Sequence, residues 1–137
     1  MWSASPAEAS RTLNGELLDI DSARGVCRFR FEIVPAFCHS QGKICQGGFL
    51  TGMVDVAMAN AAMARSKFAF AVPTLEIKMS FLEAVGPGSV IAEGRVLRWG
   101  GSVGFLDGDI KDEKGRLIVH ATSTVKIVRP RPTSSRA

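Results

Sequence analysis

The segment from Gln46 to Ser66 constrains the fold more than any other part of the chain. It reads QGGFLTGMVDVAMANAAMARS, contains no proline, is rich in alanine and methionine, and carries one carboxylate, Asp55, among small and apolar side chains. Alanine and methionine are strong helix formers, and a helix of about twenty residues spans about 30 Å, the width of a small domain. Because this helix is apolar on nearly all sides, we expect it to be buried in the centre of the fold.

The remainder of the sequence alternates polar and apolar residues with a period of two, which is typical of strands with one buried face. Strands are expected at residues 13–20, 26–33, 74–81, 89–98, 102–111 and 116–128. Residues 35–46 show no sustained period and are expected to be irregular. Short turns separate the last four strands, which favours an antiparallel meander. The predicted class is α+β, with a curved antiparallel six-stranded sheet wrapped around one long central helix.

The length of 137 residues is enough for one domain. We expect residues 1–12 to form a flexible lead-in and residues 13–128 to form the domain. The last residues, 129–137, are rich in proline, serine and arginine and are expected to form a flexible basic tail.

The chain carries a formal net charge of +4, with basic residues dispersed along the sequence. There is no lysine or arginine run with interleaved aromatic residues, so the sequence gives little support for nucleic-acid binding. A basic protein suits an anionic small ligand, such as one that carries phosphates. The functional class is therefore expected to be a small-molecule enzyme or binding protein.

Three cysteines, Cys27, Cys38 and Cys45, are odd in number and lack paired spacing. The N-terminus shows no apolar export signal, so we expect free thiols, a reducing compartment and a cytoplasmic location. Only His39 and His120 could join the cysteines as zinc ligands, and no CxxC motif is present. No metal site is expected.

The start of the helix offers a site for a developing negative charge. Gly47 and Gly48 open it, and the first N–H groups of a helix lack internal partners and lie at the positive end of its dipole. Glycine allows a ligand to approach that backbone closely. Asp55 follows about two turns later and, since a buried unpaired carboxylate is costly, must face a cavity, a partner or an interface. On the residues alone, a tight turn at the glycines and an arginine or backbone partner for Asp55 remain alternatives.

The combination of Gln46-Gly47-Gly48, Asp55 eight residues after Gly47, the strand from Pro73 to Lys78, and a glycine-punctuated meander resembles the hotdog-fold acyl-CoA thioesterases. Its pattern is similar to the phenylacetate-pathway (PaaI-like) branch, from about Phe37 to Val128. The resemblance implies a hotdog fold, an acyl-CoA substrate and no cofactor, because coenzyme A is part of the substrate. It also implies a homodimer, or a tetramer of two dimers, in which each site takes its aspartate from one subunit and its glycine from the other.

The resemblance also implies roles for particular residues. Asp55 is the expected general base or nucleophile, and the Gly48 amide is the expected oxyanion donor. Thr74 is expected to hold either the attacking water or Asp55, although it could equally be an ordinary strand threonine. Gln46 stands where the family often has histidine; glutamine can hydrogen-bond a carbonyl but cannot titrate near neutral pH.

Four further residues are expected to contact substrate. Gly47 adjoins the oxyanion donor, and Ser40 or His39 falls where the family often places a polar residue against the acyl carbonyl. Met58 lies on the same predicted helix face as Asp55. Phenylalanine and methionine near the helix favour a short-to-medium or aryl acyl group.

Three other interpretations are weighed against a thioesterase. A non-catalytic acyl-CoA-binding protein on the same scaffold is the main alternative, because Gln46 replaces the usual histidine. A hotdog dehydratase requires an HxxxGxP motif that the segment from His39 to Lys43 does not supply. A transmembrane helix at residues 47–66 would place Asp55 near the bilayer centre, at a cost of about 2.5–3.5 kcal/mol.

Overall fold

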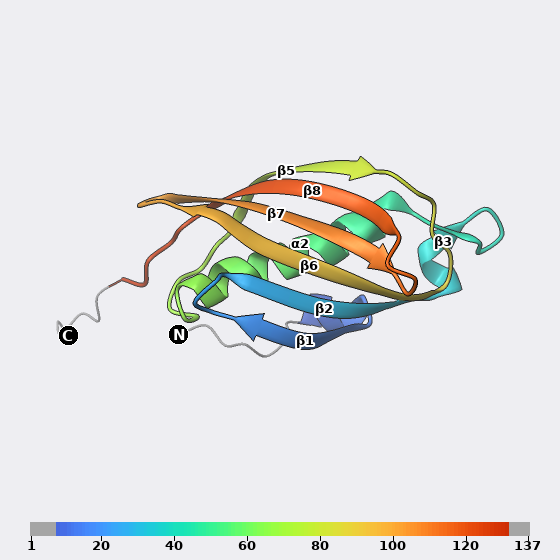
Figure 1. Cartoon of the computed structure of the whole chain (residues 1–137), viewed down its shortest axis with the longest axis horizontal. Helices are drawn as coiled ribbons and strands as arrows, with labels where there is room; N and C mark the ends of the chain where they lie inside the picture. The colour runs from blue at the N-terminus through green and yellow to red at the C-terminus, as the bar shows by residue number, and fades with distance from the viewer. Residues whose placement is uncertain (1–7, 132–137) are drawn as a thin grey trace.

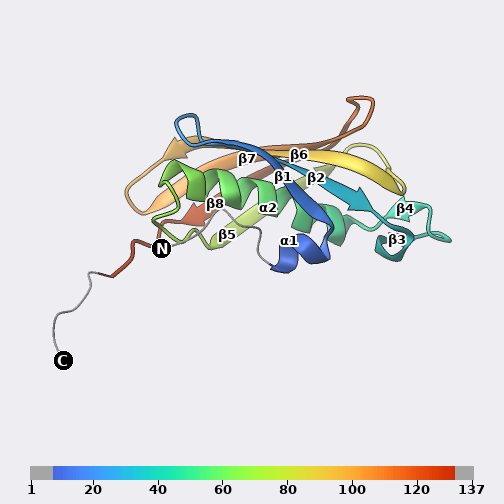
Figure 2. The ribbon, with the colours of Figure 1, turned by 90° about the horizontal axis from the view of Figure 1, so that it is seen from below.

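Helix α2 (Gly47–Arg65) lies against one face of a curved six-stranded antiparallel sheet (Figures 1 and 2). This computed structural model describes residues 8–131. The six strands are β1 (Gly15–Asp21), β2 (Val26–Ile33), β5 (Thr74–Phe81), β6 (Gly88–Trp99), β7 (Val103–Asp112) and β8 (Leu117–Lys126). The predicted central helix and six-stranded sheet are both confirmed.

The order of the strands corrects one prediction. The sheet runs β1-β2-β6-β7-β8-β5, so β6, β7 and β8 form the expected meander but β5 lies at the far edge beside β8. Residues 82–87 carry the chain across the end of the sheet, where Leu82 N donates to Ile118 O at 2.8 Å and Cys45 N to Val85 O at 2.8 Å. Hairpin loops are typically two to five residues long, so this connection is long enough to leave the neighbouring position.

The segments around the first hairpin and before α2 contain more structure than expected. Residues 8–12, assigned to the flexible lead-in, form a short helix, α1 (Glu8–Thr12), with Ser10 buried; residues 1–7 of that lead-in lie outside the described residues. The segment expected to be irregular contains a 3-10 turn, η1 (Pro35–Phe37), and a small ribbon of β3 (Cys38–His39) and β4 (Ile44–Cys45). This ribbon lies at the end of the molecule where α2 begins (Figure 2).

Two paired glycines allow α2 to lie close to the sheet. Gly94 of β6 pairs with Gly108 of β7 beneath the middle of the helix. A Cβ atom at Gly94 would collide with the backbone of Ala57 and Met58, and one at Gly108 would lie 3.0 Å from Cγ2 of Val54. The glycines therefore form a notch in the sheet that receives one turn of the helix.

The C-terminal strand is shorter than predicted and ends at Lys126. Val128 then forms an isolated antiparallel bridge with Ala71, so the chain remains paired beyond β8. Residues 132–137 of the predicted tail lie outside the described residues. Within residues 8–131, no helix combines the length and apolar character needed to cross a membrane.

Candidate active site

Within residues 8–131, one face of α2 is left partly open. The side toward the sheet is buried, whereas Gly48 is exposed and Thr51, Gly52, Asp55 and Ala59 are partly exposed. In a single chain, the predicted central helix is therefore buried toward the sheet and partly exposed on the other side. The open face is composed of small residues around one carboxylate.

Asp55 has a single side-chain partner on this open face. Thr74, the first residue of edge strand β5, donates its hydroxyl to Asp55 Oδ1 at 3.0 Å. Burial raises the pKa of the Asp55 carboxyl above its ordinary value, and the Thr74 hydrogen bond lowers it in part. A half-buried carboxylate with a raised pKa and a hydroxyl neighbour is suited to accept a proton from water.

Gln46 caps the start of α2 and contacts the predicted oxyanion donor directly. Its Oε1 accepts a hydrogen bond from Gly48 N at 2.7 Å, so this otherwise unpaired helix N–H is satisfied. The predicted donor is thus engaged by the side chain two residues earlier. The sequence signal was a glutamine directly before two glycines, although glutamine is not among the usual N-cap residues.

Asp55 and Gly48 do not meet within one chain. They are seven residues apart on α2, which corresponds to about 10 Å along the helix axis. A site that uses both groups on one small carbonyl therefore needs a second copy of α2.

A cavity of about 340 Å³ opens beside the start of α2. The ring of Phe81 lies over Gly47, where an added Cβ would be 3.0 Å from Phe81 Cζ. The lining also includes Ile44, Cys45 and Leu50 together with the connection that follows β5. Gly47 thus borders an apolar cavity, which the sequence analysis did not identify because its walls come from segments far apart in the chain.

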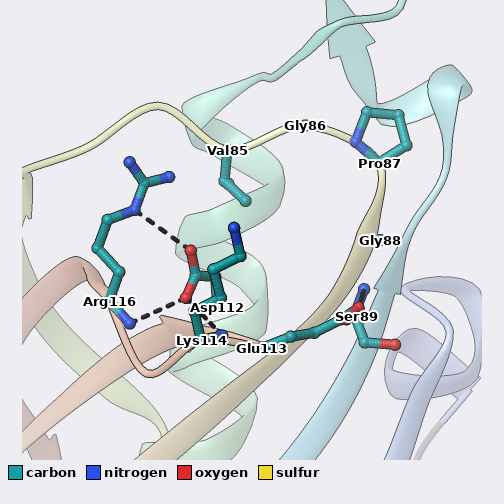
Figure 3. Close-up of a pocket in the computed structure, with 9 residues that line it drawn as sticks. All are labelled: Val85, Gly86, Pro87, Gly88, Ser89, Asp112, Glu113, Lys114 and Arg116. Atoms are coloured by element: carbon teal, nitrogen blue, oxygen red, sulfur yellow. Dashed lines mark hydrogen bonds and ion pairs between the residues drawn. The ribbon is translucent and has the colours of Figure 1, made fainter.

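A larger cavity of about 580 Å³ lies between the β5–β6 connection and the β7–β8 turn (Figure 3). Its wall is half polar and half apolar and contains Arg116, whose Nε lies 3.2 Å from Asp112 Oδ2. The two cavities share Val85, and neither is lined by Asp55 or Thr74.

The other predicted substrate contacts are placed elsewhere. His39 and Ser40 lie exposed on the β3–β4 ribbon, where His39 Nδ1 and Ser40 Oγ hydrogen-bond to one another at 2.9 Å. Met58 is fully buried in a single chain, with its Cγ against Gly108 of the sheet, so it lies away from the open face that carries Asp55. Its contact with substrate stays a prediction.

Arg95 lies in a cluster of acidic side chains on β6 and β7. Its guanidinium contacts Glu93 at 2.6 Å, Asp107 at 3.0 Å and Asp109 at 2.8 Å. His120 Nε2 also lies 3.2 Å from Asp107 Oδ2. Within residues 8–131, no group of three or more histidine, cysteine or acidic residues is arranged to hold a metal ion.

Comparisons with known proteins identify the family. Residues 42–119 match the model of the thioesterase superfamily, and a Saccharolobus solfataricus protein named as an esterase is 32% identical over 89 residues, which cover 65% of this chain and 63% of that protein. The structure of a phenylacetic acid degradation-related protein from Ralstonia eutropha JMP134 superposes with a TM-score of 0.82 at 27% identity, covering 89% of this chain and 92% of that one.

A thioesterase structure from Streptococcus pneumoniae TIGR4 shares the fold, with a TM-score of 0.81 at 18% identity over 91% of this chain and 95% of that one. Together with the match over more than half of the chain, these similarities confirm the resemblance to phenylacetate-pathway hotdog proteins. The chain belongs to the thioesterase superfamily, a family of thioester hydrolases with the hotdog fold.

Proposed function

We propose that this protein is an acyl-CoA thioesterase that works as a homodimer, with Asp55 as general base or nucleophile. The observation that carries the proposal is the Asp55–Thr74 pair on the open face of α2, at 3.0 Å. Family membership supports the reaction class, and the related S. pneumoniae structure holds coenzyme A. The chain matches 63% of the length of the S. solfataricus esterase. The acyl-CoA substrate is therefore proposed.

A second copy of α2 supplies what one chain lacks. If two α2 helices pack antiparallel about a two-fold axis near residues 51 and 52, Asp55 of one copy lies opposite Gly48 of the other, since these positions are symmetric about that midpoint. Thr51, Gly52 and Ala59 are small enough to let two helix backbones approach closely. The outer edge of β5 is also unpaired in one chain, which leaves its backbone groups open to a second copy.

The proposed reaction transfers the acyl group to water. With Asp55 as base, the carboxylate takes a proton from a water held beside Thr74, and the water oxygen bonds to the thioester carbon. The carbonyl oxygen becomes an oxyanion that accepts a hydrogen bond from Gly48 of the second copy. The oxyanion then re-forms the carbonyl as the C–S bond breaks, the thiolate takes the proton held by Asp55, and a carboxylic acid and coenzyme A leave with the carboxylate restored.

Gln46 has a positioning role in this proposal. Its Oε1 accepts a hydrogen bond from the Gly48 N–H at 2.7 Å. The substrate carbonyl oxygen must therefore displace Gln46 Oε1 as the acceptor of this N–H. The same contact favours the second candidate function, an acyl-CoA-binding protein without turnover, in which Gln46 keeps the donor occupied. Both functions predict binding, and only the first predicts release of free thiol.

The acyl group is proposed to be short-to-medium in length or aromatic. The cavity beside Gly47 has a volume of about 340 Å³ and is lined largely by apolar side chains. An apolar cavity of this size suits a small acyl group more than a long lipid chain.

The first experiment measures thiol release across a panel of acyl-CoAs of increasing chain length and aryl-CoAs. We expect turnover by the wild type and a loss of about 100-fold or more in kcat for Asp55→Asn, with binding of acyl-CoA retained in calorimetry. Binding without thiol release from any substrate would favour the non-catalytic candidate. Full activity in Asp55→Asn would remove Asp55 from the reaction.

The second experiment asks whether one site uses two chains. Gly48→Pro removes the N–H of a first-turn residue, where proline is tolerated. Its added Cβ would lie 2.7 Å from Gln46 Oε1, and Gly48→Ala is the matched control because it makes the same contact and keeps the N–H. Coexpression of Asp55→Asn with Gly48→Pro should restore about a quarter of wild-type activity, since half of the dimers are mixed and each has one intact site. No recovery in verified mixed dimers would show that both groups act within one chain.

A further inference from the structure

The β3–β4 ribbon brings two cysteines to directly opposite positions. Cys38 pairs with Cys45, and Gln46 N donates to Phe37 O at 2.9 Å beside this pair. This hydrogen bond joins the residue after Cys45 to the residue before Cys38. In an antiparallel ladder, that pattern identifies Cys38 and Cys45 as a non-hydrogen-bonded pair. In such pairs the Cα atoms are about 4.5 Å apart and the side chains lie on the same face.

That separation lies inside the range that a disulfide accepts, about 4.4–6.8 Å between Cα atoms. The two thiols also interact: after burial, the largest effects that raise the pKa of Cys45 to about 11 are the charge of Cys38 and a hydrogen bond with it. Both cysteines are free thiols in this structure. The ribbon is therefore close to the geometry of a cross-strand disulfide without rearrangement of its backbone.

The two thiols differ from the third cysteine in access. Cys38 is half-buried, and Cys45, although only 5% exposed, lines the 340 Å³ cavity beside the start of α2, which gives a small molecule a route to the pair. Cys27 is fully buried in β2, with its pKa raised to about 12 by burial and then by Asp19. Cys27 is therefore an internal control for the reactivity of Cys38 and Cys45.

We propose that Cys38 and Cys45 form a reversible disulfide, a redox modification site at the entrance to α2. With a small-molecule disulfide as oxidant, the Cys38 thiolate attacks one sulfur and releases one thiol, giving a mixed disulfide. The Cys45 thiolate then attacks the Cys38 sulfur and releases the second thiol. The pair loses two electrons and two protons, and the small disulfide is reduced to two thiols.

The bond would tie the ribbon immediately before the Gln46 cap. Cys45 Sγ now donates to Gln46 O at 3.7 Å, and Gln46 in turn caps Gly48. Oxidation converts this thiol donor into a covalent link to Cys38. The disulfide would therefore form two residues before Gly47, the first residue of the helix.

The test treats the folded full-length protein with glutathione disulfide, then blocks free thiols and maps peptides by mass spectrometry. We expect wild type and Cys27→Ser to lose the mass of two hydrogen atoms, to show a linked Cys38–Cys45 peptide, and to regain both thiols with dithiothreitol. Cys38→Ser, shown to be folded by circular dichroism, should form no internal disulfide.

Other outcomes contradict the proposal. Wild-type protein that keeps all three thiols titratable, that links Cys27 while folded, or that forms only links between chains would overturn it. The wild-type peptide map decides the matter even if a serine variant fails to fold.

Discussion

Small residues have different roles on the two faces of α2. Toward the sheet, Ala57 lies over Gly94, and the two backbones are so close that no side chain fits between them. On the opposite side, within residues 8–131, Gly48 is exposed and Gly52 and Asp55 are partly exposed, with only the side chains of Gln46 and Leu13 close to the two glycines. A run of alanine and glycine thus identifies a close approach of backbones but not the partner that approaches. Here one partner is the sheet, and the other is proposed to be a second copy of the helix.

The largest effect is expected on the sheet-facing side. Gly94→Ala places a Cβ against the backbone of Ala57 and Met58, where neither can yield as a flexible side chain would. We expect a loss of about 3 kcal/mol in the free energy of unfolding, measured by urea denaturation.

Gly101→Ala is the matched control, since an added Cβ there has no atom within 4 Å. It should change the free energy of unfolding by less than about 0.5 kcal/mol. Equal stability of the two variants would mean that the helix is not held against the sheet at Gly94.

The fold was largely predictable from local patterns. The period of two in residues 26–33 and the proline-free, largely apolar stretch at 47–65 each correspond to an element that the structure contains. The position of β5 was not predictable in this way, because alternation specifies which face of a strand is buried and not which strand lies beside it. Its partner is set by residues 82–87, whose path depends on contacts with distant Ile118 and Cys45.

The site was less predictable than the fold. Asp55, Gly48 and Thr74 could be named because their spacing follows a family pattern, and the structure shows that Thr74 contacts Asp55. Helical spacing alone placed Met58 beside Asp55, but it could not tell where the sheet covers the helix. The Gln46 cap and the Cys38–Cys45 pair depend on turns, and hydrophobic periodicity does not predict the conformation of turns.

Gln46→Ala tests the cap at the start of the helix. Loss of the bond to Gly48 N should cost about 1 kcal/mol in the free energy of unfolding, as for other N-cap side chains. If the substrate carbonyl competes with Gln46 for this N–H, the variant should also lower KM. Gln46→Asn, which offers a favoured N-cap, is the control and should retain the stability; an Ala variant as stable as wild type would contradict the cap.

Thr74→Val acts on the open face without changing the size of the side chain. The hydroxyl lowers the pKa of Asp55, so its loss should raise that pKa further. The acid limb of kcat/KM against pH should move to higher pH by up to about one unit, because a hydrogen bond contributes about 1 kcal/mol. Thr74→Ser should restore the profile, and an unchanged acid limb in Thr74→Val would show that this bond does not tune the base.

Among the expected changes in stability, that of Asp55→Asn is the smallest, and it is a gain in the free energy of unfolding. Burial raises the pKa of the folded Asp55 carboxyl, so ionisation is easier in the unfolded chain. The unfolding free energy of the wild type therefore falls as pH rises from the ordinary aspartate range through the raised pKa, whereas asparagine cannot ionise. At neutral pH the variant should have a Tm higher than wild type by a few degrees.

The pH dependence of this difference is its control. Below the ordinary pKa of aspartate both proteins are neutral at this position, so their Tm values should converge there and separate as the pH rises. A constant difference at every pH would assign the effect to packing, and a less stable variant at neutral pH would mean that the ionised carboxylate is well paired on the open face. The expected result, lower activity with higher stability, is the opposite of Gly94→Ala, which removes stability from the face that takes no part in the proposed chemistry.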